Sequence, residues 1–98
     1  MSYEYDSTIC CNVNEVWEAL RVCLLELVFQ CEDCEDGIKL RFQFGELKNS
    51  WGSDGELMLD DRDLLLTMYS GTRDQRETLL NGLNRILTSK GCAEFEEL

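Results

Sequence analysis

The sequence predicts a single α+β domain spanning residues 1–98, with two helices packed on one face of a four- to five-stranded antiparallel sheet. Three observations lead to this prediction. Residues 38–44 alternate apolar and polar side chains at strand spacing, and two longer segments repeat apolar residues at helical spacing. The elements also follow one another in the order β-α-β-β-(β)-α-β, which is typical of a ferredoxin-like arrangement.

The first expected strand covers residues 3–11, where acidic and apolar side chains alternate. Asn12, with Glu15 three residues later, predicts a helix N-cap with a capping box. From there apolar residues recur at helical spacing as far as Cys31. We therefore expect a long amphipathic helix that runs from residue 12 to about residue 35.

The middle of the chain predicts strands separated by turns. Residues 38–44 form the clearest strand, and the glycine-rich segment 45–55 that follows is typical of a loop. Residues 56–69 allow two interpretations: two strands around a tight turn at Asp61-Arg62, or one long strand with a bulge.

The last part of the chain predicts a second helix and a short final strand. Thr72 and Gln75 fit another capping box, and an apolar stripe follows on one side of the helix. Lys90 and Gly91 are typical of a helix C-terminus. Residues 92–98 have room for one short strand, which we expect at a sheet edge.

Charge is the strongest global signal, because twenty acidic residues against nine basic ones give a formal net charge of −11. A surface this negative repels phosphate backbones, so we expect no direct nucleic-acid binding. It attracts basic protein surfaces and accelerates association with them. No apolar run reaches the roughly 20 residues of a membrane span, and the first residues lack a signal-peptide pattern. We therefore expect a cytoplasmic protein without membrane contact.

The sequence contains no histidine. This removes the usual general base, the Ser-His and Cys-His nucleophile pairs and the commonest metal ligand. Glycine-rich phosphate loops of the GxxxxGKS or GxGxxG type are also absent. We therefore expect that the protein is not an enzyme and needs no cofactor.

Cys31 and Cys34 form a CxxC pair within the segment CEDCEDG at 31–37. In redox proteins such a pair opens a helix, whereas here it falls at the expected C-terminal end, where the dipole and four carboxylates disfavour thiolates. One pair also supplies only two of the four ligands of a closed zinc site. Three other cysteines lack the spacing of a second pair: Cys10, Cys11 and Cys92. We expect free buried thiols and no metal, with a zinc or thiol protein as an alternative.

Two features of the first helix and of the loop concern recognition. Val22, Leu25 and Phe29 form a second apolar stripe, roughly opposite the expected core stripe. Either the second helix or a loop covers this stripe, or it serves as a homodimer seam or a docking groove. Trp51 in the central loop either plugs the edge of the core or is exposed as a binding anchor.

These features favour a small acidic, non-enzymatic binding or inhibitor protein that docks on a basic protein, such as a nuclease or another nucleic-acid-binding protein. Immunity proteins and phage anti-defence (anti-CRISPR-like) inhibitors work in this general way, and they are similar to this chain in size and charge alone. A homodimeric acidic chaperone or adaptor that uses the second apolar stripe is the alternative. The expected partner contacts are Glu32, Asp33, Glu35, Asp36, Trp51, Asp60, Asp61 and Asp63.

Overall fold

The computed structural model of the chain describes residues 2–28, 30–45 and 53–98. Neither described helix is long and apolar enough to cross a membrane. The elements in chain order are β1 (Tyr3–Thr8), α1 (Val13–Leu27), β2 (Gln30–Cys34), the 3-10 turn η1 (Glu35–Gly37), β3 (Lys39–Gln43), β4 (Gly55–Asp60), β5 (Asp63–Met68), α2 (Arg73–Ser89) and β6 (Glu96–Glu97).

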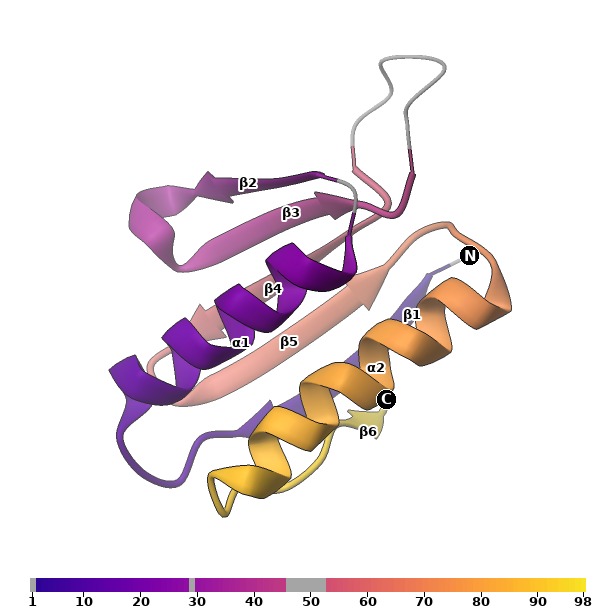
Figure 1. Cartoon of the computed structure of the whole chain (residues 1–98). Coiled ribbons are helices and arrows are strands. Elements are labelled where there is room, and N and C mark those ends of the chain that lie inside the picture. The colour runs from indigo at the N-terminus through magenta and orange to yellow at the C-terminus, as the bar shows by residue number, and fades with distance from the viewer. Residues whose placement is uncertain (1, 29, 46–52) are drawn as a thin grey trace.

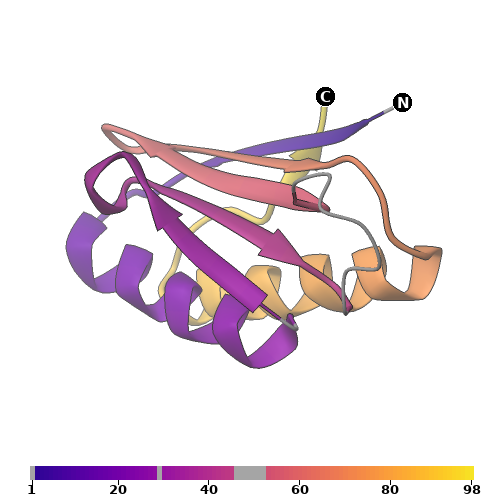
Figure 2. The same cartoon turned by 90° about the horizontal axis from the view of Figure 1, so that it is seen from above.

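The strands form one antiparallel sheet in the order β2-β3-β4-β5-β1-β6 (Figure 1). Both helices lie side by side under one face of this sheet, and the opposite face carries neither helix (Figure 2). The α+β class with two helices and an antiparallel sheet is therefore confirmed. Within the described residues the sheet has six strands rather than four or five. The ferredoxin-like arrangement stays a prediction.

The additional strand arises where the sequence predicts the end of the first helix, and that prediction is wrong. Helix α1 ends at Leu27, and Val28 adopts extended backbone angles of φ −117° and ψ 159°. Residues 30–34 then pair with β3, which places Cys31 opposite Phe42. The three-residue spacing of Val28, Cys31 and Cys34 favours a helix, but residues 30–34 pair with a neighbouring strand instead, because tertiary contacts override local propensity.

Residues 56–69 form two strands, as one of the two interpretations expects. Strands β4 and β5 pair from Gly55–Met68 to Asp60–Asp63, with Asp61 and Arg62 in the turn. Asp61 has a positive φ of 59°. The tight hairpin turn requires this left-handed conformation, and aspartate tolerates it better than most residues.

The two helix starts differ. Thr72 caps α2 as predicted: its hydroxyl accepts from the Gln75 backbone N–H at 3.1 Å, and its own N–H donates to the Gln75 side chain at 2.8 Å. Asn12 is the N-cap residue of α1, but its φ of 46° is left-handed and its side chain makes no capping hydrogen bond. The predicted capping box at Asn12 is therefore wrong, and Glu15 accepts from Lys90 Nζ at 3.1 Å instead.

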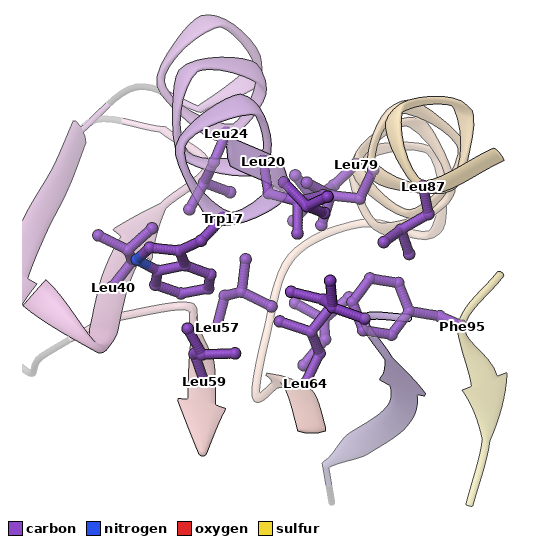
Figure 3. Packing of buried hydrophobic residues seen from close by; sticks show 14 of the residues in the cluster. Trp17, Leu20, Leu24, Leu40, Leu57, Leu59, Leu64, Leu79, Leu87 and Phe95 are labelled. Carbon is purple, nitrogen blue, oxygen red and sulfur yellow. The ribbon is translucent and has the colours of Figure 1, made fainter. Parts of the chain in front are cut away.

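The hydrophobic core fills the space between the helices and the covered face of the sheet. Leu20 and Leu24 of α1 point towards Leu57 of β4, and the leucines of α2 complete the layer (Figure 3). Trp17 lies at one side of this cluster, and its indole N–H donates to the Gly37 carbonyl at 2.8 Å. That bond ties α1 to the turn between β2 and β3.

Candidate functional site

The sheet face that the helices leave uncovered carries most of the candidate binding residues, and we call it the open face. Strand alternation puts every second residue on this face. The pairing register sets which of these residues are neighbours. Every strand except β3 contributes at least one carboxylate to the open face, namely Glu4, Asp6, Glu32, Glu56, Asp60, Asp63 and Glu96.

The centre of the open face is apolar. Met58 and Leu65 are direct cross-strand partners, and both are half-buried. Asp6 lies opposite Leu65 on the other side, in the neighbouring strand β1. Cross-strand neighbours on one face have Cβ atoms about 5 Å apart. A small apolar patch therefore lies between Asp6 on the β1 side and Lys39, the direct partner of Met58, on the β3 side. An apolar centre with a charged rim is the composition of a contact surface.

The basic residues of the open face are concentrated on β3, and they are paired within the protein. Lys39 Nζ lies 3.2 Å and Arg41 Nε 3.8 Å from Glu56 Oε2. The Tyr69 hydroxyl donates to the other oxygen of Glu56 at 2.9 Å. Burial and this hydrogen bond raise the pKa of Tyr69. The carboxylate of Glu56 is therefore compensated, and it is not a free anion for a partner.

The hairpin end of the open face carries carboxylates without such compensation. Asp60 and Asp63 are direct cross-strand partners, and Asp63 also accepts from Thr8 Oγ1 at 3.2 Å. The turn with Asp36 lies at the same end of the sheet, where Leu59 N–H donates to the Ile38 carbonyl. Within the described part of the chain none of these aspartates forms an ion pair. Negative charge therefore concentrates at this end.

The structure separates the other expected partner contacts. Glu32 lies on the open face opposite Arg41, as the pairing of β2 with β3 requires. Asp33 is on the covered side and forms an ion pair with Arg21 of α1, so its charge is already used within the fold. The Glu35 side chain and Trp51 lie outside the described residues.

The second apolar stripe is exposed on the outer side of α1. Val22 is 47 % and Leu25 is 51 % exposed, whereas Phe29 lies outside the described residues. Helix α2 therefore does not cover Val22 and Leu25. A groove of about 750 Å³ runs between the two helices beside Val22, with Glu18 and Glu26 on the α1 side and Arg85 and Lys90 on the α2 side.

The CxxC pair does not form a chelating site. Along a strand, side chains three residues apart point to opposite faces, with Cα atoms about 10 Å apart. Cys31 faces the covered side, where burial and the nearby Asp33 carboxylate raise the pKa of its thiol. Cys34 faces the open side. Neither a redox pair nor half of a zinc site is compatible with this geometry.

Three other cysteines converge at the end of the molecule where β1 leads into α1. The sulfur atoms of Cys10, Cys11 and Cys92 all lie within 4.8 Å of one another. Sequence reasoning named these residues but found no spacing to connect them, because Cys92 lies 81 positions after Cys11. It also missed the acidic side chains of β1 and β6. Their alternation with apolar residues is visible in the sequence, but their neighbours on the sheet are not.

Comparisons of this chain with protein families, with curated protein sequences and with solved structures found no match.

Proposed function

We propose that this chain is a non-enzymatic binding protein whose open face docks on the basic surface of another protein in the cytoplasm. One observation carries the proposal. Asp6 lies beside Leu65 on the β1 side of the Met58–Leu65 pair, and Asp60 and Asp63 face each other at the hairpin end. None of these three aspartates forms an ion pair with another described residue. A basic nuclease or another nucleic-acid-binding protein fits this chemistry, because rows of carboxylates present negative charge as a phosphate backbone does.

The charge of the open face supports fast and selective association. A net charge of −11 attracts a basic partner over several ångströms before contact. Once the surfaces meet, the apolar pair at the centre loses its remaining contact with water, which contributes about 25 cal/mol per Å² of buried apolar area. The acidic rim then excludes partners of like charge.

The experiment compares two triple variants with the same change in net charge. In the first, Asp6, Asp60 and Asp63 on the open face are all replaced by lysine. In the second, which is the matched control, Glu18, Glu26 and Glu77 on the helix layer are replaced by lysine. The partner is captured from extracts of the source cell, identified and purified, and its association rate is measured by surface plasmon resonance over a range of salt concentrations.

We expect the open-face triple to slow association about 10- to 1,000-fold at low salt and to flatten its salt dependence, because steering is lost. The control triple should change the rate far less. Equal effects of both triples would show that only total charge matters, and capture of acidic proteins alone would contradict the proposal.

A homodimeric adaptor is the second candidate, and the exposure of Val22 and Leu25 favours it. The groove beside Val22 has an acidic rim on α1 and a basic rim on α2. Such a surface is complementary to a second copy of itself about a two-fold axis. Sedimentation of the wild type and of Leu25→Glu tests this candidate: a dimer that dissociates in the variant supports it, and a monomer in both contradicts it.

A further inference from the structure

We propose that Cys10, Cys11 and Cys92 form a three-thiolate site for a soft divalent metal ion of the zinc class. The site is separate from the open face, and the proposal does not depend on partner binding. It starts from the distances between the three sulfur atoms. Cys10 Sγ lies 3.6 Å from Cys92 Sγ and 3.9 Å from Cys11 Sγ.

These separations match a metal site. Zinc binds thiolate sulfur at about 2.3 Å, so two sulfurs of a tetrahedral site are about 3.8 Å apart. A disulfide needs a sulfur–sulfur distance of about 2.05 Å, and it joins only two of the three groups. All three sulfurs lie within 4.8 Å of one another, which brings them within reach of a single ion.

The site combines Cys10 and Cys11, which follow β1, with Cys92, which follows α2, and backbone hydrogen bonds fix the position of Cys92. Gly91, with a φ of 76°, ends α2 in a Schellman motif in which Gly91 N–H donates to Thr88 and Cys92 N–H donates to Leu87. The next residues are fixed to β1, because Ser7 Oγ donates to the Ala93 carbonyl at 2.7 Å. These hydrogen bonds therefore fix the position of Cys92 beside the segment between β1 and α1.

The surroundings suit a site with net negative charge. Binding of a divalent ion by three thiols releases three protons and leaves a complex of net charge −1. The N-terminus of α1 begins two residues after Cys11, and the positive end of a helix dipole stabilises such charge. Arg62 also approaches, donating to the Cys10 carbonyl at 3.2 Å.

Exposure indicates what kind of site this is. Cys92 is buried, whereas Cys10 and Cys11 are exposed. Three protein ligands with an accessible side leave the fourth coordination position to water or to an external ligand. A bound ion would also tie the start of α1 to the end of α2, so it would stabilise the fold as well.

Cobalt(II) is the probe for the test, because tetrahedral thiolate coordination gives sulfur-to-cobalt charge-transfer absorption. The reduced, metal-free protein is titrated with Co²⁺ and then with Zn²⁺. We expect one equivalent of Co²⁺ to bind with charge-transfer bands and to be displaced by Zn²⁺. A hundredfold excess of Zn²⁺ over its Kd should raise Tm by about 10–20 °C.

Variants identify the ligands. Cys11→Ser changes an exposed side chain and should leave the fold intact, yet it should weaken Co²⁺ binding about tenfold or more and reduce the charge-transfer intensity. Cys92→Ser should do the same. Cys34→Ser is the matched control and should bind like the wild type. The proposal fails if reduced wild type shows no charge-transfer band, or if Cys34→Ser loses binding and Cys11→Ser retains it. Isolation from the cell as a metal-free Cys10–Cys92 disulfide would also overturn it.

Discussion

The two faces of the sheet are built from alternate residues of the same strands, and they have opposite properties. On the covered face, Leu57 and Leu66 are direct partners and completely buried. The next pair of the same two strands, Met58 and Leu65, lies on the open face and is half-buried between Asp6 of β1 and Lys39 of β3. The difference shows that core packing and surface charge are separable in this fold: the covered face supplies the buried core, and the open face presents charged side chains to solvent. Four substitutions or conditions test that separation.

Leu66→Ala should have the largest effect, a loss of about 2–5 kcal/mol in the free energy of unfolding, because it leaves a cavity in a fully buried position. Leu65→Ala makes the same chemical change on the open face, and it should cost roughly half as much or less. Urea denaturation followed by circular dichroism measures both. Similar losses would mean that the open face is part of the core and that the two faces do not differ in their contribution to stability.

Gly55→Ala should have the next largest effect on the free energy of unfolding. A Cβ at Gly55 would lie 2.5 Å from the Thr67 carbonyl oxygen and 2.6 Å from the Phe42 ring on the covered face. Overpacking of this kind costs about 1–3 kcal/mol. Gly45→Ala is the control, since no other described residue has an atom within 4 Å of a Cβ there. Thermal unfolding of the two variants should separate them by several degrees, and an unchanged Tm in Gly55→Ala would show that the ring has room to move.

Asp60→Asn should increase stability slightly, by about 0.2–1 kcal/mol, because it relieves repulsion from Asp63 directly opposite. The gain should shrink as salt rises. Asp61→Asn removes the same charge from the turn, where asparagine also tolerates the positive φ, and it should change stability less. A loss of stability in Asp60→Asn would show that this carboxylate supports the fold. In that case the charge would not be reserved for a partner.

The smallest effect concerns pH. Burial, with Asp33 and Glu26 nearby, raises the pKa of Cys31 and Cys23 above the ordinary 9.0. The folded state therefore holds these protons more tightly than the unfolded state. Their contribution to stability is complete below about pH 9 and is lost as pH rises through the folded pKa. The urea midpoint of unfolding of the wild type should be lower at pH 9.5 than at pH 8.0. The same decrease should be smaller in Cys31→Ala. A midpoint that rises with pH would contradict the assigned direction.

Much of the local structure follows from the sequence. The Thr72–Gln75 capping box and the strand within 38–44 depend on residues close together in the chain, and both form as predicted. For residues 56–69 the sequence left two interpretations open, and the hairpin around Asp61 is the one that forms. The errors lie where the fold overrides a local signal. At residues 28–35 the three-residue spacing favours a helix, yet residues 30–34 form a strand. Asn12 is a favoured N-cap residue, but it adopts a left-handed backbone and its side chain makes no capping hydrogen bond.

For the candidate sites, too, some features follow from the sequence and others depend on the tertiary structure. The sequence alone determined the acidic charge, the alternation along each strand and the absence of histidine, since these need no knowledge of neighbours. Only the tertiary structure decided which residues meet. Cys31 and Cys34, only three positions apart, point to opposite faces of the sheet, whereas Cys92 lies against Cys10, which is far away in the sequence. The physical reason is that strand pairing and helix packing are selected by burial of the whole core, and no short stretch of sequence contains that information.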